Sequence, residues 1–164
     1  MLSKFNFDEV KKRLELSRRE LLVLLSNQAQ NYFLRSFKNQ GFDGQAWENV
    51  KRREEGTPEY KYPKTKGLQR RSQPILTGAG WKKRGGTLRR AVSNMARTAE
   101  IDNNRFRMIV DLPYAAIHNE GGEGKAFGKY PFTMPRRQFI GQTQELTTMQ
   151  RGQIDKTIKK IWNV

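Results

Sequence analysis

"FDEVKKRLELSRRELLVLLSNQAQNYFLRSFKN", residues 7 to 39, is the stretch that decides the fold. Its apolar residues recur at spacings of seven, four and seven, which places them on one face of a helix: Leu14, Leu21, Leu25 and Tyr32. Four more residues widen this stripe: Leu22, Ala29, Phe33 and Phe37. Asn6 or Asp8 can cap the start of the helix, and Gly41 can end it. We therefore predict one helix from residue 7 to about residue 39.

A helix of this length must lie against another surface, and the composition leaves two interpretations open. Hydrophobic residues make up only 35% of the 164 residues, which is lean for a compact globule. Part of the chain is therefore expected to lie extended or to be buried against a partner. The long helix is either a core helix of the subunit or a helix shared between subunits.

Residues 42 to 86 differ in character from the helix that precedes them. Ten glycines and prolines interrupt this stretch and its apolar residues are scattered, which is typical of a long loop or arm. Residues 51 to 90 carry thirteen Lys or Arg against three Glu, a net charge of +10 within a total of +16. A charge of this size favours a polyanion or an acidic protein surface as a partner.

Two strands are expected between residues 88 and 112, joined by a turn at residues 102 to 104. The possible inner positions of the first strand are Leu88, then either Ala91 or Val92, and then Met95. In the second, residues 105 to 112, period two places three residues on one face: Phe106, Met108 and Val110. Asp and Asn tolerate turn geometry, and Pro113 stops the second strand.

The stretch "YAAIHNEGG", residues 114 to 122, predicts a short helix packed by Tyr114 and Ile117 and ended by a glycine pair. A flexible loop is expected at residues 123 to 133, and then "MPRRQFIG" as a short extended piece. A last helix is predicted from residue 142 to about 162, with these apolar positions: Leu146, Met149, Ile154, Ile158, Ile161 and Trp162.

The predicted fold class is α+β: a small antiparallel sheet flanked by a long N-terminal helix and a C-terminal helix, with a long basic loop or arm. We expect a single domain over residues 1–164, because one domain accommodates this length. It divides into an N-terminal helix (1–41), an extended basic arm (42–86), a sheet with a short helix (87–141) and a C-terminal helix (142–164).

Catalytic chemistry lacks its usual groups in this sequence. The chain has one histidine, His118, and no cysteine, so disulfides and thiolate metal sites are excluded and a His-rich metal site has no ligands. Neither a Walker-type loop nor a Gly-x-Ser-x-Gly elbow occurs. We expect no catalytic residues, no metal, no cofactor and no small-molecule substrate. His118 is expected to be structural, bonded to backbone or to a neighbouring subunit.

Membrane insertion is not expected, because no segment approaches the ~20 apolar residues that cross a bilayer. The start, "MLSKFNFDEV", lacks the apolar core of a signal peptide. These observations favour a protein that is made, and used or assembled, in the cytoplasm.

The basic arm leaves two kinds of partner open. Its cations are interleaved with Trp47, Tyr60, Tyr62 and Trp81, so cations could neutralise phosphates while aromatic rings stack on bases. Arms of this kind also dock on acidic neighbours in assemblies. The candidate contacts to DNA or to an acidic partner are Lys51, Arg52, Arg53, Arg70, Arg71, Lys82, Lys83 and Arg84.

Several segments, taken in order, resemble one family. "WENVKRRE" is followed by "ILTG", "LRRAV", "YAAIHNEGG" and "MPRRQFIG". This order is similar to the tailed-phage virion morphogenesis, or tail completion, proteins of the Mu-like type. That family reads Tyr-Ala-x-hydrophobic-His-x-x-Gly-Gly and then hydrophobic-Pro-x-Arg-x-Phe-hydrophobic-Gly. The match runs from about Trp47 to Gly141, and Arg137 falls in the usual arginine position.

Two departures concern the path of the arm. Thr77-Gly78 is separated from Leu88 by the basic "AGWKKRGGT", where the family has the two nearly adjacent. Ala91 stands where a serine is common.

The resemblance implies a structural, non-enzymatic protein of the head–tail junction, or neck. Such a subunit would form a ring, for which we expect a hexamer, next to neck or tail-tube proteins and around the passing genomic DNA. It would assemble in the host cytoplasm and reside in the virion. The expected interface residues are Arg136, Arg137, Phe139, His118, Trp47 and Trp81. The alternative is a nucleic-acid-binding protein that uses residues 51–90; an enzyme such as a nuclease or lysin is a third hypothesis.

Overall fold

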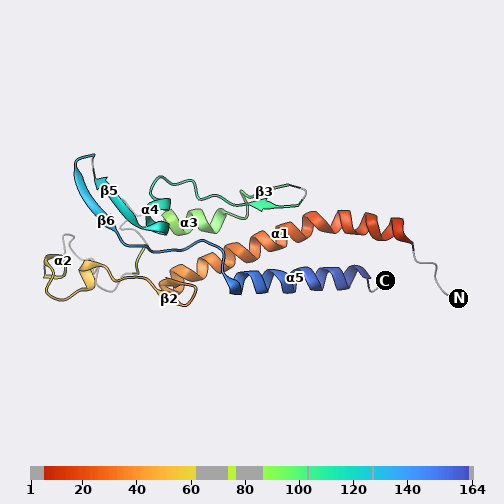
Figure 1. Ribbon diagram of the computed structural model, residues 1–164, viewed down its shortest axis with the longest axis horizontal. Helices are drawn as coiled ribbons and strands as arrows, with labels where there is room; N and C mark the ends of the chain where they lie inside the picture. Colours follow the sequence, from red (N-terminus) through yellow and green to blue (C-terminus); the bar gives the residue numbers. More distant parts are fainter. Residues whose placement is uncertain (1–5, 62–73, 77–86, 103, 127, 163–164) are drawn as a thin grey trace. The chain divides into compact units, whose positions relative to one another are not determined.

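The computed structural model describes residues 6–61, 74–76, 87–102, 104–126 and 128–162 (Figure 1). It combines helices with small antiparallel sheets and has a long N-terminal and a C-terminal helix, so the predicted α+β class is confirmed. Over the described ranges, no helix has the length and apolar content that a membrane span needs.

The N-terminal helix α1 spans Phe7–Asn39, as the apolar periodicity predicts. Asn6 caps its start, because the side-chain Oδ1 accepts hydrogen bonds from the amides of Asp8, at 3.1 Å, and Glu9, at 3.2 Å. At the other end Gln40 adopts a left-handed φ of 54° and turns the chain out of the helix. Gln40, and not Gly41, therefore terminates the helix.

Gly41 serves the hairpin that follows α1. Strand β1 (Gly41–Phe42) pairs antiparallel with β2 (Gln45–Ala46). A Cβ at Gly41 would lie 2.4 Å from the Gln45 carbonyl oxygen, so only glycine lets the two strands approach this closely.

Burial along α1 is uneven. The predicted stripe is buried over the second part of the helix, at Leu22, Leu25, Ala29, Tyr32, Phe33 and Phe37. In the first part Leu14 is 41% exposed and Leu16 is 67% exposed, so the apolar face predicted for α1 is not covered there within the single chain. The first turns of α1 thus present apolar side chains to solvent.

The predicted arm has more regular structure at its start than a loop. After β1 and β2 come a short 3-10 helix η1 (Lys51–Arg53) and the helix α2 (Pro58–Lys61). Residues 62–73 and 77–86 of the arm lie outside the described residues. Between these ranges, Ile75 is buried at 3% exposure.

The predicted strand at residue 88 is wrong, because helix α3 spans Thr87–Asn94. Leu88, Val92 and Met95 are buried, at spacings of four and three. These spacings bring side chains to one face of a helix, whereas the period-two alternation of this stretch is loose.

A turn follows as predicted, but the strands beside it are short. Strand β3 (Glu100–Ile101) pairs antiparallel with β4 (Phe106–Arg107), and the Asp102 amide donates to the Arg105 carbonyl at 3.0 Å. Strand structure therefore covers only two of the residues predicted for 105 to 112.

The loop predicted at residues 123 to 133 is also wrong. Strand β5 (Gly122–Ala126) pairs antiparallel with β6 (Tyr130–Met134), and Gly124 lies opposite Phe132. Both flanking helices are as predicted: α4 spans Ala115–Glu120 and α5 spans Gln144–Trp162.

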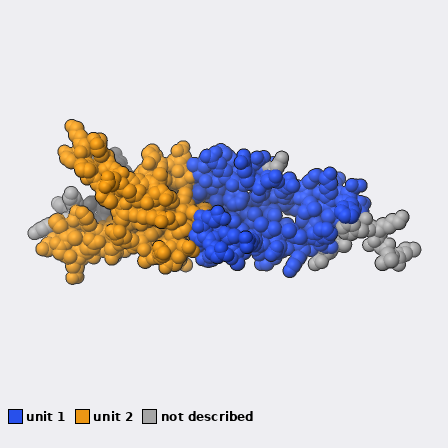
Figure 2. All heavy atoms as spheres, in the orientation of Figure 1, with its two compact units in different colours: residues 1–32, 94–109, 142–164 blue, residues 33–93, 110–141 orange. Residues whose placement is uncertain are grey.

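The chain forms two compact units (Figure 2). Unit 1 comprises Met1–Tyr32, Asn94–Ile109 and Gln142–Val164. Within it the start of α1 and α5 lie side by side and antiparallel (Figure 1). The Thr143 hydroxyl donates to the Tyr32 hydroxyl at 3.0 Å, and the Gln28 side chain donates to the Met149 carbonyl at 3.3 Å. Unit 2 comprises Phe33–Ser93 and Val110–Gly141, and contains the motif segments described next.

Candidate functional site

Three of the segments that the sequence singles out are joined by hydrogen bonds inside unit 2. We call this place the motif junction: residues 47–49 after β2, residues 118–121 at the end of α4, and residues 136–141 after β6. "ILTG" and "LRRAV" contribute buried side chains to the same unit, namely Ile75, Leu88 and Val92.

Arg137 connects all three segments of the junction. Its guanidinium donates from Nε to the Glu48 carbonyl, at 3.2 Å, and from Nη2 to the Asn49 carbonyl, at 3.1 Å. Its backbone amide donates to the His118 carbonyl at 2.8 Å. The side chain is only 6% exposed, so the two carbonyls replace the water that the cation gives up.

Asn119 holds the chain that follows Arg137. Its Oδ1 accepts hydrogen bonds from the amides of Phe139, at 3.0 Å, and Ile140, at 3.1 Å. Its Nδ2 donates to the Glu120 carboxylate at 2.6 Å. One buried side chain at the end of α4 thus satisfies two amides of an extended segment that has no strand partner of its own.

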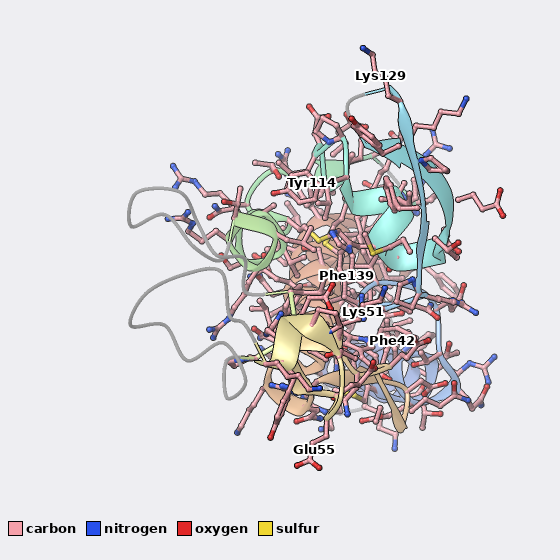
Figure 3. The ribbon with its side chains drawn as sticks, turned by 90° about the vertical axis from the view of Figure 1, so that its left-hand side faces the viewer. Phe42, Lys51, Glu55, Tyr114, Lys129 and Phe139 are labelled. Carbon is pink, nitrogen blue, oxygen red and sulfur yellow. The ribbon has the colours of Figure 1, made fainter. Side chains whose placement is uncertain are left out.

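Phe139 fills the centre of unit 2, where it is fully buried (Figure 3). Its ring centroid lies 5.6 Å from that of Phe37, and Phe37 meets Trp47 edge-on at 5.8 Å. The Trp47 indole donates to the Gln138 carbonyl at 2.7 Å, and the Ser36 hydroxyl donates to the Phe139 carbonyl at 3.1 Å. The aromatic cluster and the hydrogen bonds therefore fix the same segment from two sides.

Gly121 lets α4 end against the segment after β6. Its φ of 74° lies in the left-handed region, which favours glycine. A Cβ at this position would lie 2.9 Å from the Arg136 amide nitrogen and 3.0 Å from the Met134 carbonyl oxygen. Gly121 is therefore explained by a close backbone approach as well as by helix termination, whereas Gly122 is explained by its positive φ of 118° alone.

His118 is half-buried beside Arg137, and Tyr114 meets its ring edge-on at 6.0 Å. Its Nδ1 is buried and has no hydrogen-bond partner in the described part of the chain, so the expected side-chain bond to backbone is not formed there. Burial lowers the pKa of His118 from its usual 6.5, and the Arg137 guanidinium lowers it further. The imidazole is therefore neutral at pH 7.

Arg137 keeps its charge in this setting. Burial lowers the pKa of the guanidinium from its ordinary value, and the Glu48 carboxylate acts in the opposite direction. An arginine remains protonated at neutral pH even so. The positive charge of Arg137 disfavours a second cation beside it, which is consistent with a neutral His118.

The side chains of the junction serve mainly as hydrogen-bond partners for backbone groups. Arg137, Asn119, Trp47 and Ser36 each bond to main-chain atoms of another segment. Within the ranges that the structure describes, no three His, Asp or Glu side chains gather in a way that could hold a metal ion. What this arrangement can do is hold three distant segments in one shape.

Three of the predicted interface residues have almost no surface to offer. Phe139 is fully buried, Arg137 is 6% exposed and Trp47 is 8% exposed, because each is used inside the subunit. The expectation that they contact another subunit is corrected accordingly. Arg136 is exposed, with Nη2 donating to the Gln138 side chain at 2.6 Å.

The predicted basic contacts fall mostly outside the described residues. This holds for Arg70, Arg71, Lys82, Lys83 and Arg84, and also for Trp81, which was predicted as an interface residue. Lys51 is exposed, whereas Arg52 and Arg53 are half-buried, and the Arg52 guanidinium donates to the Pro74 carbonyl at 3.2 Å. The structure therefore does not gather the predicted cations into one described patch.

Sequence reasoning missed Asn119 and Ser36. Ser36 carries a usable signal, since it is a polar residue between Phe33 and Phe37 on the buried stripe of a helix, and buried polar groups need partners. Asn119 stands within "YAAIHNEGG", where no feature of the sequence distinguishes it from an exposed polar residue.

Comparisons with protein-family models, with curated proteins and with solved structures gave no match. The resemblance to phage tail completion proteins therefore remains a prediction from the order and spacing of the motifs. The motif junction is the structural observation that bears on it.

Proposed function

We propose that this chain is a structural virion protein of a tailed phage, which forms a ring at the head–tail junction and joins the tail to the DNA-filled head. The observation that carries the proposal is the motif junction. Residues of the two family-like patterns each have an architectural task there: Arg137 clamps two carbonyls, Phe139 fills the core and Gly121 permits a close backbone approach.

This use of the motif residues favours a scaffold over a catalyst. A catalytic site needs side chains with free polar atoms aimed at a substrate. At the junction the guanidinium of Arg137 and the amide of Asn119 are instead directed to backbone groups of their own chain. Such a site gives a subunit a defined shape, which an assembly protein requires of its subunits.

The exposed apolar residues support an assembly. Tyr130 is 67% exposed, Ile109 is 47% exposed and Leu16 is 67% exposed. Together with the lean hydrophobic content, they fit a subunit that completes its burial against neighbours. Pairing through the outer edges of β5 and β6 is less suitable, because Pro131 and Lys125 blunt them.

Electron microscopy tests the proposal. Negative-stain images are recorded of the purified full chain, alone and mixed with the proteins encoded by its neighbouring genes. We expect closed rings in at least the mixture. Monomers alone in every mixture would contradict the proposal.

Nucleic-acid binding is the second candidate function, favoured by the net charge of +10 over residues 51–90. Phosphate contacts weaken steeply with salt, so tight binding to DNA at ~0.2 M salt would favour this alternative. A ring protein that only surrounds passing DNA is expected to bind it weakly under those conditions.

A further inference from the structure

We propose that the groove between α1 and α5 in unit 1 binds an amphipathic helix with acidic flanks, supplied by a partner protein. The groove has a volume of about 570 Å³ and is formed by side chains of both helices. The proposal names a surface and a partner chemistry that ring formation does not require, and it stands on unit 1 alone.

The floor of the α1–α5 groove is apolar. It is lined by Leu16, Leu21 and Leu24 of α1 and by Ile161 of α5. Leu16 is 67% exposed and Leu24 is 48% exposed, although both belong to the helix pair that forms the core of unit 1. They lie eight residues apart, which is about 12 Å, or two turns, along the helix axis. A helix that presents apolar residues at i and i+7 covers this distance.

A second hollow lies on the opposite side of the contact between α1 and α5. It has a volume of about 400 Å³ and shares Leu21 and Ile161 with the groove. Leu14, which is 41% exposed, and Ile158, which is 40% exposed, also line it. Leu14, the exposed member of the predicted apolar stripe of α1, therefore lines the second hollow and not the groove.

The rim of the groove is cationic. Arg13, Lys156 and Lys160 line it, against the single carboxylate of Glu20. Arg13 already pairs with Glu9 at 2.5 Å. Lys156 and Lys160 are exposed, stand four residues apart on α5, and form no ion pair with any described residue.

Charge complementarity selects the occupant. An apolar floor with a cationic rim fits a helix that has an apolar stripe flanked by Asp or Glu. A second copy packed groove to groove would place its own Arg13, Lys156 and Lys160 against this rim, which like-charge repulsion opposes. We therefore assign the groove to an acidic partner helix and not to self-association.

A labelled synthetic helix of about 20 residues is the probe, with leucine at i, i+3, i+4 and i+7 and glutamate at the flanking positions. Its binding to the full chain is measured by fluorescence anisotropy. A matched peptide carries lysine in place of glutamate, and a second has the same composition in scrambled order. We expect the glutamate helix to bind and both controls to bind at least ~10-fold more weakly.

Charge-reversal variants of α5 test whether the glutamate helix binds at the cationic rim of the groove. Lys156→Glu combined with Lys160→Glu is expected to weaken the glutamate helix by at least ~10-fold, because it reverses the rim. Lys159→Glu is the matched control: this lysine is exposed on the same helix but does not line the groove. It is expected to change affinity by less than ~3-fold.

Truncation of the floor supplies an independent test on α1. Leu24→Ala is expected to weaken binding by ~5-fold or more through lost apolar contact. Val23→Ala is its control, because Val23 is 40% exposed on the same helix and lies outside the lining. Circular dichroism of each variant establishes that the helices are retained.

Three results would overturn the proposal. They are no binding of the glutamate helix, equal binding of the lysine helix, or equal effects of the groove variants and their controls. Analytical sedimentation of the chain without peptide tests whether a second copy of the chain occupies the groove instead. If the chain self-associates, Leu16→Ala abolishes this self-association, and the peptide does not bind, the groove belongs to a second copy. Ring formation in electron micrographs is scored separately, so the two proposals can fail independently.

Discussion

At the scale of one residue, position 137 of the motif junction needs the shape of an arginine side chain as well as its positive charge. Its guanidinium reaches the carbonyls of Glu48 and Asn49 with two different nitrogens. A lysine carries the same charge on a single nitrogen and cannot reproduce this fork.

Arg137→Lys is therefore expected to lower the free energy of unfolding by about 1–2 kcal/mol, since at least one buried carbonyl loses its donor. Urea denaturation followed by circular dichroism measures the change. Arg136→Lys is the matched control: the neighbouring arginine is exposed, and the change is expected to stay within about 0.5 kcal/mol. Equal effects of the two substitutions would contradict the role assigned to Arg137.

His118 gives the junction a dependence on pH. Burial and Arg137 lower its pKa in the folded chain below the usual 6.5, so the unfolded chain binds more protons as pH falls through this range. The contribution of the neutral imidazole to stability is complete above about pH 6.5. It is lost as pH falls toward the lowered folded-state pKa.

The measurement is the urea midpoint between pH 7.5 and about 5, compared between the native chain and His118→Gln. The carboxylates titrate in both proteins, so the difference between the two curves isolates His118. We expect the native chain to lose more stability than the variant on acidification. Parallel curves would show that His118 has the same pKa in the folded and unfolded chain.

At the scale of the elements, replacing two different glycines by alanine is expected to change stability in opposite directions. Gly121→Ala forces a Cβ against the segment after β6 at a φ of 74°, and is expected to destabilise the chain by at least ~1 kcal/mol. Gly152→Ala lies inside α5 with nothing within 4 Å of the added Cβ. It is expected to stabilise the chain by about 0.5–1 kcal/mol, through helix propensity. Thermal or urea unfolding of both variants checks the two signs.

Elements with a strong apolar period could be predicted from the sequence, and elements without one could not. Helices α1 and α5 are long enough for periodicity and caps to agree. α3 has eight residues, and its buried Leu88 and Val92 were assigned to a strand. The hairpin β5–β6 was read as a loop because glycine, lysine and proline interrupt it and its described side chains are mostly exposed. In β6 half-buried Phe132 and Met134 alternate with exposed Pro131 and Thr133, but β5 opposite, with its glycines and charges, has no such apolar alternation in its sequence.

The contacts of the motif junction could also be predicted only in part from the sequence. The spacing of "MPRRQFIG" identified Arg137 and Phe139, but their partners lie far away in the sequence. Arg137 bonds to a carbonyl 88 residues away, and Trp47 to one 91 residues away. A pattern along the chain carries no information about which residues will bury these side chains, so an intramolecular role was mistaken for an interface role.

The whole molecule carries a formal charge of +16, which predicts a measurable response to salt. A fluorescent DNA duplex is titrated with the chain at increasing salt. We expect weak binding at low salt that falls steeply as salt rises, because it rests on the release of counterions. Binding that stays tight at ~0.2 M salt would favour the nucleic-acid function over the ring.

Assembly into a ring is tested most directly by native mass spectrometry of the full chain mixed with the proteins encoded by its neighbouring genes. Each subunit has a mass of 19.2 kDa. We expect one closed oligomer of this chain, with a hexamer as the expected species, that carries one or more of these proteins. Monomers of 19.2 kDa in every mixture, with the chain folded, would contradict it.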